Sequence, residues 1–190
     1  YRMSYYRYQK EQPIPGQLQE IARDFASVVA LNKKYGIYGA YQNHSGYSFF
    51  GGPVWDLWEV LRELDPAHAG CQYDVRHATV EGGYAWELGL RLLTPWLYTT
   101  VIKDFVWDKN KKGKWYAKSV PLGKGMVDFE QYFSYVKENN ISGPISLHYE
   151  YPITREPAKS LSKQERWQQT LATLKKDVQA LRGMLVRHGL

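Results

Sequence analysis

Side chains that can bind a ligand or move a proton follow four hydrophobic runs of this 190-residue chain. They are carboxylates, imidazoles, cationic groups and one amide. In chain order they are Gln42, His44, Asp74, Arg76, His77, Lys103, Asp104, His148 and Glu150. Carboxylates and imidazoles act as general acids and bases, and both bind divalent cations. We therefore expect a small-molecule site wherever the ends of these runs lie side by side.

The hydrophobic runs have the length of β-strands, and helical patterns separate them. The expected strands cover residues 2–8, 37–42, 69–74, 97–103 and 144–149, and the expected helices cover residues 17–35, 53–61, 84–93, 128–138 and 161–187. Residues 106–126 are expected to form a long loop. Strands that alternate with helices form parallel sheets, and ligands bind at the carboxyl ends of their strands. This pattern fits either an open doubly wound sheet or part of an eight-stranded barrel.

Composition narrows the range of partners. The net charge of +6 is spread along the chain, and the densest lysine cluster (residues 109–114) falls in the expected loop 106–126. A solvated loop explains it better than a phosphate-binding patch, so we expect no nucleic-acid partner. No run approaches the roughly 20 apolar residues of a membrane span, so we expect no membrane partner. Cys71 is the only cysteine, which excludes an intramolecular disulfide, and both cytoplasmic and periplasmic locations stay open.

Five segments, in this order, resemble the later strands of the xylose-isomerase-like TIM barrel superfamily of sugar isomerases and epimerases. They are YQNHSG, QYDVRHA, VIKDF, PLGKGMVDF and SLHYEY. The resemblance implies an α/β fold of the (β/α)8 TIM barrel type, with only the last five βα units present. Residues 1–190 would then be a single domain, the carboxyl-terminal part of the barrel. Because an arc of five strands cannot close, we expect either a piece of a longer protein or self-association through its exposed sheet edges.

The resemblance also implies a metal cofactor with a reduced set of ligands. Metal-dependent relatives hold one divalent cation with residues from strands five to eight, and the matching positions are Gln42, Asp74, Val101 and Glu150. Asp74 and Glu150 keep the carboxylate of a metal ligand. Gln42 has no charge, and Val101 cannot coordinate a metal. The implied cofactor is manganese, zinc or magnesium, held chiefly by Asp74 and Glu150.

The activity that the resemblance implies is isomerisation or epimerisation of a sugar or polyol derivative. Such enzymes remove a proton next to a carbonyl group. Glu150 is the expected base, and His77 and Lys103 would supply acid or electrostatic help. Lys103 and Asp104 should point to opposite faces, and we favour Lys103 for the site. The expected substrate-binding residues are Gln42, His44, Arg76 and His148.

An alternative is a non-catalytic carbohydrate-binding relative that keeps the pocket and has lost part of the ligand set. A small-molecule sugar is the expected partner under both hypotheses. An abasic-site endonuclease on the same barrel is disfavoured, because its trinuclear metal site needs more histidines than the five of this chain.

Overall fold

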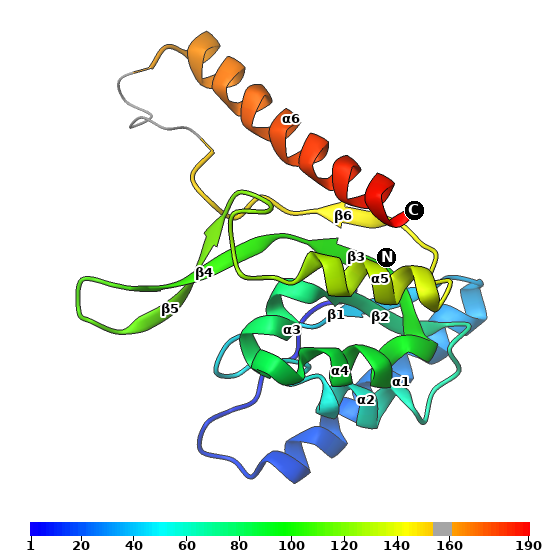
Figure 1. Cartoon of the computed structure of the whole chain (residues 1–190). Helices are drawn as coiled ribbons and strands as arrows, with labels where there is room; N and C mark the ends of the chain where they lie inside the picture. Colours follow the sequence, from blue (N-terminus) through cyan, green and yellow to red (C-terminus); the bar gives the residue numbers. More distant parts are fainter. Residues whose placement is uncertain (154–160) are drawn as a thin grey trace. The chain divides into compact units, whose positions relative to one another are not determined.

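A computed structural model describes residues 1–153 and 161–190 of the chain. Figure 1 shows the chain coloured along its sequence. The chain divides into two compact units. Unit 1 comprises Tyr1–Val101 with Ile141–Ser146, and unit 2 comprises Ile102–Asn140 with Leu147–Leu190. The single domain expected for residues 1–190 stays a prediction.

A parallel sheet positions the polar residues of unit 1. The sheet has the order β1-β2-β3-β6, and its strands are β1 (Gly39–Gln42), β2 (Ala69–Asp74), β3 (Leu97–Ile102) and β6 (Ile145–Leu147). Strands β1, β2 and β3 run parallel, so the expected direction of pairing is confirmed. Gln42 pairs with Gln72 and Asp74 with Val101, so the ends of neighbouring strands adjoin. Strand β6 is shorter than the expected strand 144–149.

The segment before the first helix does not form the strand expected at residues 2–8. It makes two isolated bridges, Arg2 with Ala40 in parallel and Arg7 with Phe49 in antiparallel. The backbone N–H of Tyr6 donates to the hydroxyl of Tyr41 rather than to a strand carbonyl. The segment therefore begins beside β1 and then leaves it.

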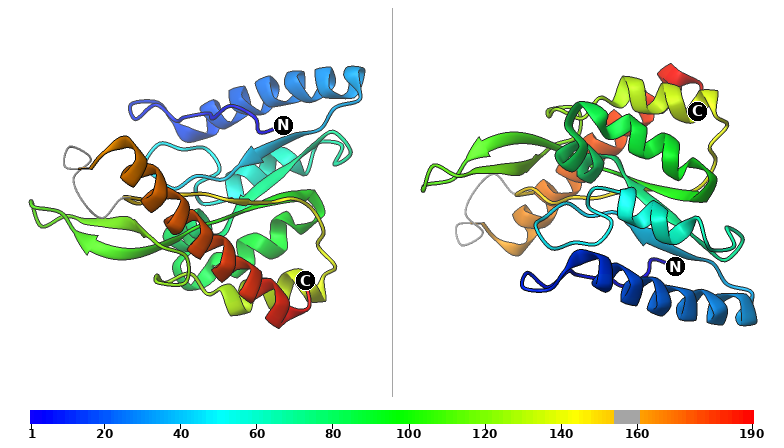
Figure 2. Two further views of the ribbon diagram at one scale, coloured as in Figure 1. Left: turned by 90° about the horizontal axis from the view of Figure 1, so that it is seen from above. Right: turned by 90° about the horizontal axis from the view of Figure 1, so that it is seen from below.

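The helices of unit 1 are α1 (Ile14–Tyr35), α2 (Trp55–Leu61), α3 (Val75–Gly82) and α4 (Trp86–Leu93), with 3-10 turns at Gly83–Ala85 and Thr94–Trp96. Helices α1, α2 and α4 lie below strands β1 and β2 in Figure 1, and Figure 2 gives two further views of the same elements. Helix α1 follows Pro13 and ends at Gly36, whose φ of 62° is the left-handed cap that glycine favours. Helix α3 was not expected from the sequence. Its N-cap is Asp74, whose side chain accepts the backbone N–H of His77.

Unit 2 contains an antiparallel hairpin where the sequence predicted a loop. Strands β4 (Asp104–Lys109) and β5 (Trp115–Val120) pair along their whole length, so the prediction of a loop at residues 106–126 is wrong up to Val120. Asn110 closes the turn, because its side-chain oxygen accepts the N–H groups of Lys112 and Lys114. The lysine cluster therefore lies at the end of an exposed hairpin.

Two helices complete unit 2. They are α5 (Phe129–Glu138) and α6 (Lys163–His188). Helix α6 begins with a capping box of Ser162 and Glu165, which confirms Ser162 as one of the two expected caps. The other, Ser160, lies outside the described residues. No helix within residues 1–153 and 161–190 is long and apolar enough to cross a membrane.

Candidate functional site

A buried hydrogen-bond network joins the carboxyl ends of β1 and β2. Gln42, the last residue of β1, donates from Nε2 to Oδ2 of Asp74, the last residue of β2, over 2.8 Å. Asn43 strengthens this link, because its amide accepts the N–H of Asp74 at 2.7 Å and donates to the carbonyl at 3.0 Å. Asp74 and Asn43 are fully buried, and Gln42 is 2% exposed. The network holds the two strand ends in one arrangement.

The orientation of the Gln42 amide follows from its other partners. Its Oε1 accepts from the hydroxyl of Tyr5 at 2.8 Å and from Nη1 of Arg2 at 3.4 Å. A guanidinium can only donate, so the amide oxygen faces Arg2 and the amide N–H faces Asp74. Gln42 therefore presents a donor, and not a metal-ligand oxygen, to the Asp74 carboxylate.

The contacts of His77 decide which of its ring nitrogens carries the proton. Nδ1 lies 2.9 Å from Nη1 of Arg76 and 2.7 Å from Oγ of Ser45. Because Arg76 can only donate, Nδ1 is the acceptor, and the neutral ring carries its proton on Nε2. Nε2 lies 3.5 Å from Oδ2 of Asp74. Asp74 thus holds His77 through both the backbone N–H and the ring.

His44 and Arg76 complete this cluster in unit 1. The rings of His44 and His77 lie with centroids 3.9 Å apart. Nδ1 of His44 lies 2.8 Å from the carbonyl oxygen of Ser45, so it carries a proton there. Arg76 is 6% exposed and donates to Oγ of Ser45 over 3.2 Å. The structure therefore brings five predicted residues of unit 1 together: Gln42, His44, Asp74, Arg76 and His77.

An ion pair in unit 2 joins two further predicted residues. Nζ of Lys103 lies 2.6 Å from Oε1 of Glu150, with the Lys103 side chain 2% exposed and that of Glu150 41% exposed. Lys103 follows β3 directly, and Glu150 lies beyond the end of β6. The N–H of His148 donates to the carbonyl of Ile102 over 3.0 Å, which keeps this segment beside β3. That this pair and the cluster of unit 1 line one pocket stays a prediction.

Asp104 has a different role from Lys103. Its carboxylate accepts the backbone N–H groups of Phe105, Gly123, Gly125 and Val127. Burial raises the pKa of Asp104, and these N–H groups act in the opposite direction. A Cβ at Gly125 would lie 2.1 Å from Oδ1 of Asp104, so only glycine fits there. Gly123 and Gly125 thus shape a loop that Asp104 holds.

Sequence reasoning missed four residues that contact the predicted ones. They are Arg2, Tyr5, Asn43 and Ser45. Asn43 carried a signal, since it directly follows a strand and lies next to Gln42. Arg2 and Tyr5 carried none, because their contact with Gln42 spans 40 and 37 positions of the chain.

The side chains that surround the two carboxylates do not fit a resident divalent cation. Asp74 meets the N–H groups of Gln42 and His77, and Glu150 meets the ammonium of Lys103. Val101, at another ligand position of the family, is apolar and fully buried. Within residues 1–153 and 161–190, no three His, Cys, Asp or Glu side chains are grouped closely enough to bind a metal ion.

The sequence as a whole decides the family. The family model described as "Xylose isomerase-like TIM barrel" matches residues 3–177. The chain belongs to this family. The expected α/β fold of the (β/α)8 barrel type is thereby confirmed. No curated protein matches the chain by sequence.

Solved structures share the fold at low sequence identity. A xylose isomerase domain protein from Planctomyces limnophilus is 18% identical with a TM-score of 0.69, over 97% of this chain and 58% of that one. The 3-keto-D-glucoside 4-epimerase YcjR from E. coli is 16% identical with a TM-score of 0.59, over 88% and 57%. A xylose isomerase-like TIM barrel protein from Mycobacterium smegmatis in complex with magnesium is 13% identical with a TM-score of 0.60, over 94% and 55%. This chain thus spans less than two thirds of the length of each.

Proposed function

We propose that the protein acts on a sugar or polyol derivative as an isomerase or epimerase, with Glu150 as base and Lys103 as its electrostatic partner. The observation that carries this proposal is the ion pair of 2.6 Å between a buried ammonium and a partly exposed carboxylate. Family membership and the epimerase among the similar structures support the class of substrate.

The pair has the two groups that proton transfer next to a carbonyl requires. The carboxylate of Glu150 removes a proton from the carbon beside the carbonyl, which leaves an enolate oxygen with negative charge. The ammonium of Lys103 stabilises that charge. In isomerisation, Glu150 returns the proton to the neighbouring carbon while the hydroxyl proton of that carbon moves to the enolate oxygen. In epimerisation, an acid on the opposite face, for which we propose His77, gives a proton to the same carbon. No proton is gained or lost overall, so the reaction needs no further reactant.

The cluster in unit 1 supplies groups suited to sugar hydroxyls. Arg76 offers donors, His44 with its proton on Nδ1 offers Nε2 as an acceptor, and His77 has its ring orientation held by Asp74. We assign His44, Arg76 and Gln42 to substrate binding, together with His148 of unit 2. Asp74 then acts as a positioning residue for His77.

A divalent metal has no step in this proposal. The family resemblance implies manganese, zinc or magnesium on Asp74 and Glu150, but donors already occupy both carboxylates. We therefore expect the activity to survive dialysis against EDTA and to be unchanged by added Mn²⁺. Activity that is lost with EDTA and returns with Mn²⁺ would show that the ligand set is sufficient.

A non-catalytic carbohydrate-binding role is the second candidate. The amide of Gln42 favours it, because an amide replaces one of the two carboxylates that exchange protons in epimerases of this family. Under this hypothesis the protein binds a sugar without exchanging any carbon-bound proton.

Deuterium exchange separates the two candidates. The protein is incubated in D₂O with a panel of ketoses, aldoses and their keto derivatives, and carbon-bound deuterium is followed by NMR. We expect Glu150→Gln to lower the exchange rate by about a hundred-fold or more and to leave sugar binding in place. Glu138→Gln, at the exposed end of α5, is the matched control. It should leave both the exchange rate and sugar binding unchanged. Full exchange activity in Glu150→Gln would exclude Glu150 as the base, and binding without exchange would establish the second candidate.

A further inference from the structure

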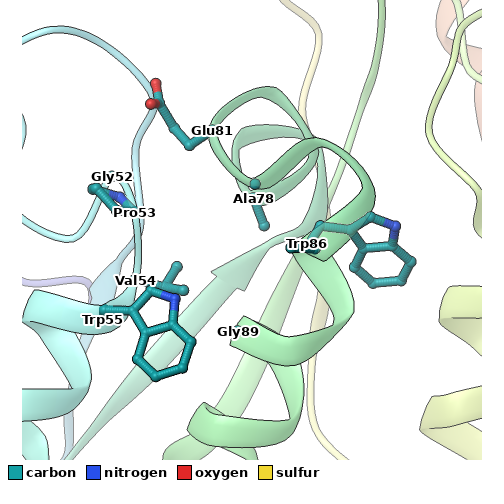
Figure 3. Close-up of a pocket in the computed structure, with 10 residues that line it drawn as sticks. Gly52, Pro53, Val54, Trp55, Ala78, Glu81, Trp86 and Gly89 are labelled. Atoms are coloured by element: carbon teal, nitrogen blue, oxygen red, sulfur yellow. The ribbon is translucent and has the colours of Figure 1, made fainter.

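Unit 1 contains a hollow of about 280 Å³ between the start of α2 and the helices α3 and α4. In Figure 3 the Glu81 carboxylate points out of this hollow and the Trp86 indole is turned away from it. Oε1 of Glu81 accepts the backbone N–H of Gly46 over 2.8 Å. The other described residues around the hollow are small or apolar. Specific ligand sites need a few polar groups that converge, so the described lining of this hollow selects no ligand.

Unit 2 has a buried carboxylate that the proposed reaction does not use. Asp177 lies in α6 and is 3% exposed, and its buried neighbours on this helix are Leu181 and Met184. A buried charge costs free energy unless hydrogen bonds satisfy it. Oδ2 of Asp177 accepts the hydroxyl of Tyr151 over 2.7 Å and the backbone N–H of Leu122 over 3.4 Å. This carboxylate therefore holds two segments that lie 26 and 55 positions away in the chain.

The first of these segments carries Glu150. Tyr149 and Tyr151 flank Glu150 in the chain, and both of their hydroxyls donate to groups of α6. The acceptor for Tyr149 is the carbonyl oxygen of Leu174, at 3.1 Å. The residue between the two tyrosines contacts the ammonium of Lys103. The two hydroxyls therefore fix the backbone on either side of the proposed base.

The second segment leads to the other member of the ion pair. Leu122 precedes Gly123, whose N–H donates to the carboxylate of Asp104 over 3.0 Å. Asp104 follows Lys103 directly in the chain. The loop thus connects Asp177 to the backbone of Lys103, and the ion pair itself closes this ring of contacts within unit 2.

We propose that Asp177 is a positioning residue for the base, because through the hydroxyl of Tyr151 it keeps the carboxylate of Glu150 against the ammonium of Lys103. Its effect on catalysis rests on the proposed function, whereas its effect on the ion pair does not. The Glu150 side chain is 41% exposed, so water competes for its carboxylate, and the anchored backbone limits the positions that it can take. Burial and the hydrogen bond to Asp177 raise the pKa of Tyr151, so its hydroxyl stays a donor at neutral pH.

Acetylation of Lys103 tests the position of Glu150 without any substrate. The Lys103 side chain is 2% exposed, so an N-hydroxysuccinimide acetate should modify it slowly, and exposed Lys111 of the hairpin gives the reference rate. Mass spectrometry of peptides measures both rates. We expect Tyr151→Phe to raise the rate at Lys103 by about ten-fold relative to Lys111, toward the rate found in Glu150→Ala. An unchanged rate in Tyr151→Phe would overturn the proposal.

Further variants separate positioning from general stability. Asp177→Asn keeps an oxygen that can accept from Tyr151 and should be labelled as slowly as the unmodified protein, whereas Asp177→Ala should be labelled as fast as Tyr151→Phe. Tyr116→Phe, which removes the hydroxyl of a tyrosine 41% exposed on the hairpin, is the matched control and should change nothing. The amide of Val127, which Asp104 holds, should keep its protection from hydrogen exchange in every variant. Slow labelling in Asp177→Ala, or loss of Val127 protection in Tyr151→Phe, would contradict a positioning role.

Kinetics then test the link to catalysis. In the deuterium-exchange assay, Tyr151→Phe should lower kcat by about ten-fold or more and leave KM within about two-fold, because the position of the base affects the chemical step. A raised KM with an unchanged kcat would overturn the role in catalysis. If the unmodified protein exchanges no deuterium with any sugar, the proposed function fails, and the labelling of Lys103 still decides whether Asp177 positions Glu150.

Discussion

Asp104→Ala should destabilise unit 2 more than any surface change in the hairpin. The substitution leaves four backbone N–H groups without their acceptor: those of Phe105, Gly123, Gly125 and Val127. Gly123 and Gly125 are exposed and can turn to water, whereas Phe105 is 1% and Val127 8% exposed. Two buried bonds to a charged acceptor at about 1.5–3 kcal/mol each give a loss of roughly 3–6 kcal/mol. The substitution also removes the free-energy cost of burying the Asp104 charge, so the expected loss of stability lies at the lower end of that range.

The assay is urea unfolding followed by far-UV circular dichroism, with hydrogen exchange of individual amides as the local measurement. A loss of about 3 kcal/mol is a large part of the 5–15 kcal/mol that holds a typical domain. The Val127 amide should lose its protection even if the rest of the unit stays folded. Asp108→Ala, which removes an exposed carboxylate of the same strand, is the control and should cause no measurable loss. Equal urea midpoints for the two variants, with Val127 still protected, would refute this reasoning.

The raised pKa of Asp104 also predicts how the stability of the fold changes with pH. Burial raises the pKa of Asp104 in the folded protein, so the folded state binds a proton more tightly than the unfolded chain. The stability that this group contributes is therefore greatest below its ordinary pKa and falls as the pH rises through the raised value. Asp104→Asn should lack this part of the pH dependence in urea unfolding measured between mildly acidic and neutral pH. An identical pH profile in the two proteins would contradict the assignment.

Three further predictions concern unit 1. Burial raises the pKa of the Cys71 thiol, so Cys71 should react with a disulfide reagent at pH 8 only after urea unfolds the protein, and rapid native-state labelling would argue against this. Gly89→Ala should cost about 1–3 kcal/mol in urea unfolding because its Cβ meets Val54; Gly16→Ala, which meets no atom within 4 Å, should cost nothing. Gln42→Glu places a second carboxylate against buried Asp74 and should lower the Tm by about 5–10 °C. Added Mn²⁺ should restore the Tm of that variant and leave the unmodified protein unchanged, and an undiminished Tm would contradict the orientation of the Gln42 amide.

The sequence by itself determined the elements whose signals are local. Apolar spacing and the terminal Gly36 placed α1, and the serine cap placed the start of α6. Strand β2 lies where the sequence predicted it, because an apolar run ends there in a polar residue. The order of strands and helices with these polar ends, compared with a known family, was enough for the barrel fold. Each of these signals lies within a few neighbouring residues.

Tertiary structure decided what depends on partners far along the chain. Strands β4 and β5 form a hairpin whose turn is closed by Asn110. The lysines of this turn led the sequence analysis to predict a loop. The sequence placed Lys103 and Asp104 on opposite faces and favoured Lys103 for the site. Only the fold shows that the Asp104 carboxylate accepts the backbone N–H groups of Gly123 and Gly125.

Gln42 shows most clearly that the sequence alone does not determine what a polar side chain does. Its residue type is compatible with a weak metal ligand or with a structural donor. Contacts with Arg2 and Tyr5 on one side and Asp74 on the other decide the direction of its amide. Hydrogen bonds are directional, so the chemistry of such a side chain depends on which groups the fold brings to it and not on its identity alone.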